Sequence, residues 1–189
     1  MLSVLDILKN ISKGQTALKT SSIKKDLDTF YEKVRSKIQI KHVSLDGPAT
    51  QIYFKLPATD YPLFYDVVIL FNTVSRITTS TLIKVYSNSP NFAFNYCYLF
   101  FRERSLLFPN KYPSIFLTDP PKIRNPLEIK AFDKHIYACL RYVSKMNLTE
   151  LSNNYQGNPE PTVKSFDEKM EEIKKTHKEM KELKASRGI

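Results

Sequence analysis

Glycine and cysteine are scarce in this chain of 189 residues, and each shortage excludes a class of function. The four glycines are Gly14, Gly47, Gly157 and Gly188. No two of them lie close enough to build the glycine-rich loop that holds a nucleotide phosphate. The two cysteines, Cys97 and Cys139, are too few for a disulfide framework, and no CxxC motif for zinc is present. We therefore expect two buried thiols in a reducing compartment, and neither a metal site nor a cofactor site.

Long apolar runs are also missing. The longest, residues 67–71 and 96–101, are far shorter than the ~20 residues of a membrane-spanning helix. Asp6 and Lys9 interrupt the first eleven residues, so a signal peptide is not expected. The sequence predicts no association with a membrane.

A catalytic arrangement is not evident from the sequence. Asp133 and His135 are two residues apart on a predicted helix, so their side chains point in different directions. His42 belongs to a predicted strand, and His177 to a predicted helix near the end of the chain. No serine or cysteine has the sequence context of an activated nucleophile. We expect no catalytic residues and a protein that is not an enzyme; unrecognised chemistry would require a polar pocket that a sequence does not display.

The residues that are present describe a basic globular protein. Hydrophobic residues make up 42% of the chain, charged residues 25%, and the net charge is +10. These proportions are typical of a folded domain rather than of a disordered chain. Residues 148–189 carry equal numbers of acidic and basic side chains, so the positive excess lies on the earlier part of the chain. An acidic partner is one interpretation of this excess, and solubility is the other.

The most distinctive stretch is residues 91–101, NFAFNYCYLFF. With a period of two, its five alternating aromatic side chains share one face, which predicts a central β-strand packed against the helices. The middle of the stretch partly matches the aromatic strand of RNA-recognition domains, but the flanking residues and the order of elements do not. Core packing is the preferred interpretation over base stacking.

Alternating or continuous apolar residues predict further strands at 38–45, 51–56, 64–72 and 81–86, joined by short turns. Apolar side chains at helical spacing predict helices at 3–12, 22–38 and 126–146. A proline-rich arm at 108–126 is expected to wrap the sheet and to add an edge strand at 114–117. The predicted fold class is α+β: an antiparallel sheet of four to six strands packed by two helices, plus a C-terminal extension helix.

We divide the chain into an N-terminal docking helix (1–14), an α+β core domain (15–147), a linker (148–164) and a C-terminal amphipathic helix (165–189). The N-terminal helix is expected to dock either on this domain or on a partner. In the C-terminal helix, Ser165 and Glu168 have the spacing of a capping box. A seam at coiled-coil spacing follows, and we predict that it binds a partner or folds on the body. Its residues are Phe166, Met170, Ile173, His177 and Met180.

A second candidate surface is a basic line on the predicted helix 126–146. Its residues are Lys130, Lys134, Arg141 and Lys145. Such a line can contact phosphates, and binding would then depend on salt concentration. A solvated helix face is the alternative. Nucleic acid is therefore a possible partner, and an accessory nucleic-acid-binding protein is the alternative function.

The chain as a whole is rich in Lys, Asn, Ile, Tyr and Phe, lacks Trp, and combines a predicted α+β body with a proline-stiffened arm and a separable terminal helix. In these traits it resembles small virion proteins of tailed bacteriophages from low-GC hosts, which join head, neck and tail. The resemblance implies a non-enzymatic structural protein of the virion or the host cytoplasm. Its arms and helices would dock on neighbouring subunits in a homo- or hetero-oligomer.

Overall fold

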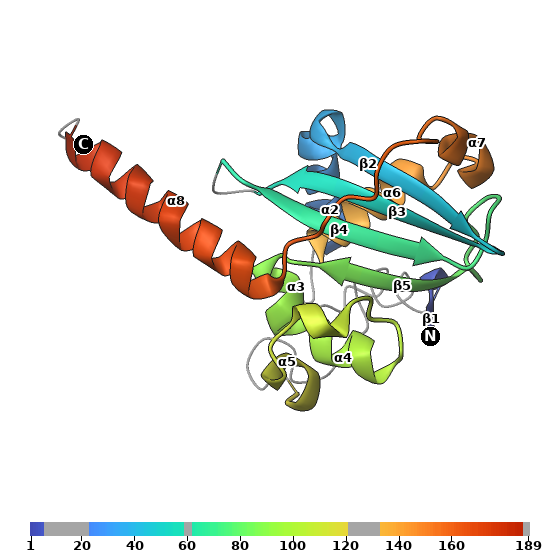
Figure 1. The fold of residues 1–189 in the computed structure, drawn as a ribbon, viewed down its shortest axis with the longest axis horizontal. Helices are drawn as coiled ribbons and strands as arrows, with labels where there is room; N and C mark the ends of the chain where they lie inside the picture. The colour runs from blue at the N-terminus through green and yellow to red at the C-terminus, as the bar shows by residue number, and fades with distance from the viewer. Residues whose placement is uncertain (6–22, 59–61, 121–132, 187–189) are drawn as a thin grey trace.

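A five-stranded antiparallel sheet lies at the centre of the protein (Figure 1). The computed structural model describes residues 1–5, 23–58, 62–120 and 133–186. The spatial order of strands is β1-β5-β4-β3-β2. Their bounds are Leu2–Ser3 (β1), Gln39–Asp46 (β2), Ala49–Pro57 (β3), Phe64–Phe71 (β4) and Leu82–Ser87 (β5). The α+β class with an antiparallel sheet is confirmed, and β2 to β5 lie where alternation and apolar runs predicted them.

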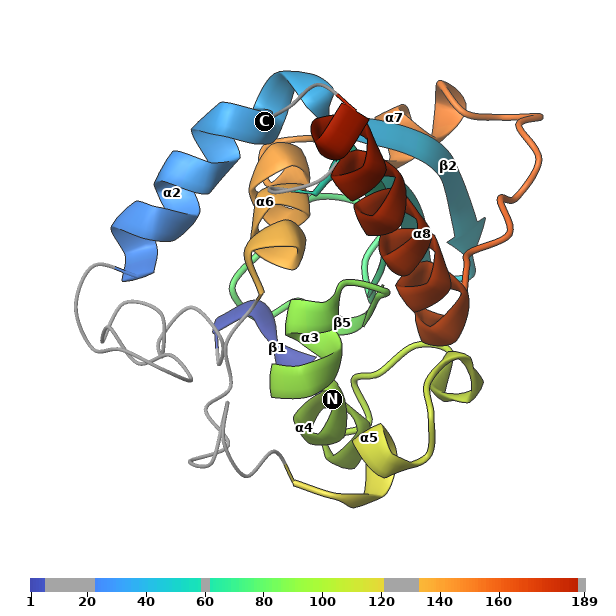
Figure 2. The ribbon, with the colours of Figure 1, turned by 90° about the vertical axis from the view of Figure 1, so that its left-hand side faces the viewer.

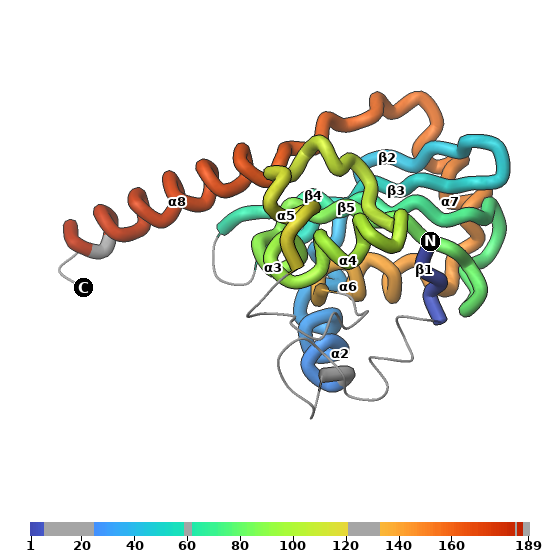
Figure 3. Tube along the Cα trace, turned by 90° about the horizontal axis from the view of Figure 1, so that it is seen from below, coloured from blue at the N-terminus to red at the C-terminus, as the bar shows by residue number. Residues whose placement is uncertain are grey.

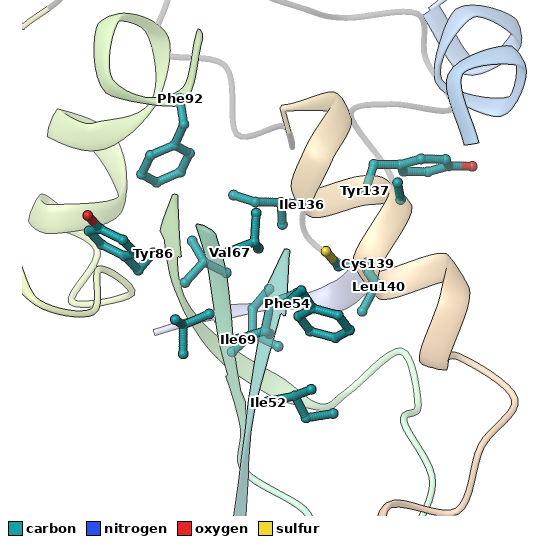
Figure 4. Packing of buried hydrophobic residues seen from close by; sticks show 14 of the residues in the cluster. Ile52, Phe54, Val67, Ile69, Tyr86, Phe92, Ile136, Tyr137, Cys139 and Leu140 are labelled. Atoms are coloured by element: carbon teal, nitrogen blue, oxygen red, sulfur yellow. The ribbon is translucent and has the colours of Figure 1, made fainter. Parts of the chain in front are cut away.

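The sheet has two differently covered faces because successive side chains of a strand point to opposite sides. On one face, Ile52 pairs with Ile69 and Phe54 pairs with Val67 across β3 and β4. These side chains are buried against α6 (Figure 4). At the β2–β3 turn, Gly47 adopts a φ of +55°, a value that glycine reaches without steric cost. The predicted turn there is confirmed.

Two helices, α2 (Ile23–Val34) and α6 (Lys134–Val143), lie side by side over this face (Figure 2). A short 3-10 turn, η1 (Arg35–Lys37), joins α2 to β2. In the described part of both helices, the side chains that helical spacing predicted to be buried are buried: Leu27, Phe30 and Val34 from α2, and Ile136, Cys139, Leu140 and Val143 from α6. Tyr137, which the same spacing places on the solvent side, is buried as well, so that part of the prediction is wrong.

The predicted helix 126–146 is wrong at its described start. Asp133 is in an extended conformation and caps α6, so the helix begins at Lys134 and ends at Val143. The Asp133 side chain accepts a hydrogen bond from the backbone nitrogen of Ile136 at 2.9 Å. An N-cap carboxylate satisfies an amide that has no partner within the helix. Residues 126–132 of the predicted helix lie outside the described residues.

The aromatic stretch 91–101 is helical, and its prediction as a central strand is wrong. It forms α3 (Pro90–Asn95) and α4 (Cys97–Arg102). Aromatic side chains that alternate also recur every four residues, so the pattern suits one helical face as well as one strand face. Phe92, Tyr96 and Phe100 are buried, whereas Phe94 is 40% exposed. The expected burial in the core is therefore correct for those three rings, but the backbone conformation is not.

Local capping favours this helical conformation. Ser89 accepts a hydrogen bond from the backbone nitrogen of Phe92 at 3.2 Å, and Pro90 occupies the first turn. Serine as N-cap followed by proline is a strong helix start. The predicted edge strand at 114–117 is also wrong, because the same region forms α5 (Ile115–Thr118) after the 3-10 turn η2 (Pro109–Lys111). The pairing edge of β5 is taken instead by β1 and by a parallel bridge from Leu106.

The two predicted extensions are partly integrated into the body. Leu2 and Ser3 pair with β5, so they are not helical, and residues 6–14 of the predicted docking helix lie outside the described residues. The start of the predicted linker 148–164 forms α7 (Leu148–Asn153), which is capped by Asn147. The following residues cross the second face of the sheet (Figure 1). There Tyr53 donates a hydrogen bond to Glu160.

Candidate functional site

The C-terminal helix α8 (Phe166–Ser186) leaves the body at its N-terminal end and projects into solvent (Figures 1 and 3). Its first residue, Phe166, is buried and contacts the rings of Phe94 and Phe116 edge-on, at centroid distances of 6.0 and 5.0 Å. Such aromatic pairs stabilise beyond the area that they bury. The root of α8 is therefore a packed part of the domain.

The predicted capping box at the start of α8 is confirmed. The backbone nitrogen of Glu168 donates to Ser165 Oγ at 3.3 Å, and the nitrogen of Ser165 donates to Glu168 Oε2 at 2.6 Å. Hydrogen bonds that the carboxyl of Glu168 accepts from the backbone and the side chain of Ser165 lower its pKa. Two amides at the helix start are thereby satisfied, and the direction in which α8 leaves the body is defined.

Charged side chains also hold the root of α8. The buried Lys169 donates to the carbonyl of Phe64 at 2.7 Å and to Glu172 Oε2 at 2.8 Å. Lys164 donates to the same oxygen at 2.8 Å. The hydrogen bond to Glu172 raises the pKa of Lys164 above its ordinary value. The sequence did not indicate this cluster, because the residues around Lys169 on the same helix turn are charged and suggest a face exposed to solvent.

The predicted partner-binding seam divides at this root. Phe166 is buried and Met170 packs on the core, whereas Ile173 and Met180 are partly buried and His177 is exposed. Leu183 is 51% exposed. The apolar line therefore begins in the body and continues along the projecting half of α8, where its side chains are only partly covered.

The positive charge of the second candidate surface, the basic line on α6, is partly compensated by acidic side chains of α2. Arg141 forms ion pairs with Asp28 and Glu32, and its guanidinium lies 4.5 Å from the centre of the Tyr31 ring. Lys134 Nζ lies 5.1 Å from the centre of the Phe30 ring. Burial and the hydrogen bond to Asp28 raise the pKa of the neighbouring Tyr137 to about 12.

Of the remaining two residues of the line, Lys145 lies exposed beyond the end of α6, and Lys130 is outside the described residues. Arg141 thus forms its ion pairs within the protein, and nucleic-acid binding by this line stays a prediction.

A buried polar cluster joins the start of α3 to the start of α6. Ser89 Oγ donates to Asp133 Oδ2 at 2.7 Å, and His135 Nδ1 lies 3.1 Å from the same oxygen. The prediction that Asp133 and His135 point in different directions is wrong, because Asp133 is the extended N-cap and not part of the helix. Burial opposes ionisation of Asp133, but His135 and the hydrogen bonds from Ile136 and Ser89 outweigh it and lower its pKa. Both Ser89 and His135 contact the carboxylate rather than each other, so His135 is not placed to activate the serine. The cluster acts as a clamp between two helix starts.

Both cysteines are buried, as expected, and burial raises the pKa of each thiol. Within residues 1–5, 23–58, 62–120 and 133–186, no group of three or more His, Cys, Asp or Glu side chains is arranged to hold a metal ion. None of the helices in those ranges combines the length and the apolar character needed to cross a membrane. Comparisons with protein-family models, with curated proteins and with solved structures found no match.

Proposed function

We propose that this protein is a structural assembly subunit that pairs with a second copy of itself through the projecting half of α8. The observation that carries the proposal is the partly exposed apolar line on a helix whose root is packed into the domain. An isolated helix of this length is marginal in water, and pairing of its apolar line is the usual source of stability. The joining role of small virion proteins, which the sequence resembles, agrees with such an activity.

The distribution of charge favours an antiparallel pair. Residues 166–173 carry four carboxylates and one lysine, whereas residues 174–186 carry five lysines and two carboxylates. Two copies in opposite directions place the acidic half of each helix beside the basic half of the other. A parallel pair would place like charge beside like charge. The charge pattern therefore supports a second copy of the chain as the occupant of the seam, in the antiparallel direction.

The pairing register follows from the seam. When Ile173 of one copy lies beside His177 of the other, Met180 reaches the exposed part of Met170 at the root, and Asp167 on the flank approaches Lys181. Asp167 and Lys181 are exposed and make no ion pair within the described chain, so both are available for this contact. Lys174 meets its own copy at the centre, which is the one unfavourable pair on this flank. The expected self-association is accordingly modest and concentration-dependent.

The test is the native mass of the full chain, measured by light scattering and sedimentation over a range of protein concentrations. We expect the mass to rise from 22.0 kDa towards twice that value as concentration increases. The variant I173S/M180S should remain a monomer because its seam is polar. The matched control K175S/E182S also introduces two serines and leaves the net charge unchanged, but it alters the opposite face of α8. A wild-type chain that stays monomeric at every concentration would contradict the proposal.

A further inference from the structure

A pocket of about 350 Å³ lies beside the root of α8, on the sheet face opposite to α2 and α6. It collects side chains that are far apart in the sequence, because β2, β3, β4 and the start of α8 all border it. Six of its side chains are ionisable: Lys41, Lys55, Asp66, Lys164, Lys169 and Glu172.

The two carboxylates in this pocket are already engaged. Asp66 Oδ2 accepts hydrogen bonds from Asn88 Nδ2 at 3.0 Å and from the backbone nitrogen of Lys164 at 3.2 Å. Lys55 Nζ approaches the other oxygen of Asp66 at 3.8 Å. Lys164 and Lys169 share one oxygen of Glu172, as described above. Neither carboxylate is therefore open to a cation.

The four lysines exceed the two carboxylates by two positive charges. Lys41 has no ion pair in the part of the chain that the structure describes, and the ion pair of Lys55 is long. Ammonium groups gathered in a concave, partly enclosed site focus a positive potential and attract an anion more strongly than the same groups on a flat surface. The net charge of the side chains that line the pocket is thus +2, which one dianion would neutralise.

We propose that this pocket binds a phosphate dianion, free or as the terminal phosphoryl group of a small molecule. Lys41 and Lys55 enter from β2 and β3, and Lys164 and Lys169 from the root of α8. Lysine binds phosphate as a point charge with three donors. Lys169, which donates to Phe64 and Glu172 and lies 5.8 Å from the centre of the Tyr65 ring, contributes its charge at the wall of the pocket. The volume of the pocket exceeds that of a lone phosphate, so it also accommodates a group attached to the phosphoryl. Binding would tighten the contact between the root of α8 and the sheet.

The test is a titration of the isotope-labelled full chain with sodium phosphate, followed by NMR amide shifts and compared with sodium chloride at equal ionic strength. We expect saturable shifts at the amides of Lys164 and Lys169 with phosphate and none with chloride. Replacing inorganic phosphate with a phosphomonoester separates the two sources: tighter binding of the ester indicates a phosphorylated small molecule, and equal binding indicates free phosphate.

Two variants make the test specific. K41M/K55M removes the two lysines with the weakest internal pairing and should weaken phosphate binding by about tenfold. The matched control K25M/K33M removes the same charge from exposed positions on α2 and should bind as the wild type does. If K41M/K55M does not fold, K41M alone, at an exposed side chain, serves in its place. Phosphate shifts that fail to saturate in the wild type, or that persist unchanged in K41M/K55M, would overturn the proposal, whatever the mass of the particle.

Discussion

At the scale of single residues, Asp133 links the start of α3 to the start of α6. It caps α6 and accepts hydrogen bonds from Ser89 and His135 in a buried position. Removing a carboxylate there leaves several buried donors without a partner. Such donors cost more than the loss of an exposed hydrogen bond. His135 Nε2 already lacks a hydrogen-bond partner among the described residues.

We therefore expect Asp133→Ala to lower the free energy of unfolding by about 2–4 kcal/mol, the sum of a lost cap and unsatisfied buried donors. Urea denaturation followed by circular dichroism measures the change. Glu179→Ala, at an exposed position of α8, is the control and should change stability by less than about 0.5 kcal/mol. An equal effect of the two substitutions would refute the role of the clamp.

The same carboxylate predicts a dependence of stability on pH. The pKa of Asp133 is lower in the folded protein than its ordinary value of 3.8, so the folded state favours the ionised form. Its contribution is present above that ordinary value and is lost as pH falls below it. The stability difference between the wild type and Asp133→Asn should thus be constant near neutral pH and shrink below about pH 4. Denaturation curves across this range check the expectation, and a difference that grows in acid would contradict it.

At the scale of elements, α3 and α4 show how one aromatic pattern serves two backbone conformations. A strand at 91–101 would bury alternate residues, whereas the helices bury Phe92, Tyr96 and Phe100 at intervals of four. Phe100 is fully buried and lies 5.5 Å from Phe92, measured between ring centroids. The adjacent Phe101 is 42% exposed. This difference gives a direct test of the packing.

Phe100→Ala should destabilise the protein by about 3–5 kcal/mol because it leaves a cavity in the core. Phe101→Ala removes the same atoms from a surface position and should cost less than about 1.5 kcal/mol. Thermal denaturation of the two variants, made in parallel, measures both effects. Similar losses at the two positions would show that the described burial of α4 is wrong.

For α8, reversing charges tests the direction of the proposed pair. Asp167→Lys or Lys181→Asp alone should weaken self-association by roughly fivefold, and the double variant should restore it. In a parallel pair the two side chains would lie about 20 Å apart along the axis and would not compensate each other. Sedimentation equilibrium measures the association, and circular dichroism confirms equal helix content. Additive losses in the double variant would exclude the antiparallel register.

At the scale of the whole molecule, a truncation within α8 should remove its projecting half without unfolding the body. Phe166, Lys169 and Met170 belong to the packed root, so removing residues 165–189 would expose Phe94 and Phe116. Ending the chain after Glu172 removes the projecting part of the apolar line but keeps the root. This shorter chain should keep the melting temperature of the full protein within a few degrees and lose self-association. A large fall in its melting temperature would place the projecting half in the folded body instead.

Much of the sheet was predictable because its signals are local. Residues 67–71 are apolar on both faces, and β4, which contains them, is the central strand of the sheet. The capping box of Ser165 and Glu168 needs only two residues at a fixed spacing, and it forms as predicted. The start of α6 was predicted wrongly although its capping contact, from the backbone of Ile136 to Asp133, is local; the contact of Asp133 with Ser89, 44 residues away, is not.

By itself, the sequence determined the fold class, the buried faces of α2 and α6, and the start and the apolar seam of α8, because each depends on residues within one or two turns of each other. Only the tertiary structure decided that 91–101 is helical, that Arg141 is paired with α2, and that four lysines share a pocket. The physical reason is that burial and electrostatic potential are sums over neighbours in space. Those neighbours come from strands and helices that the order of residues alone does not bring together.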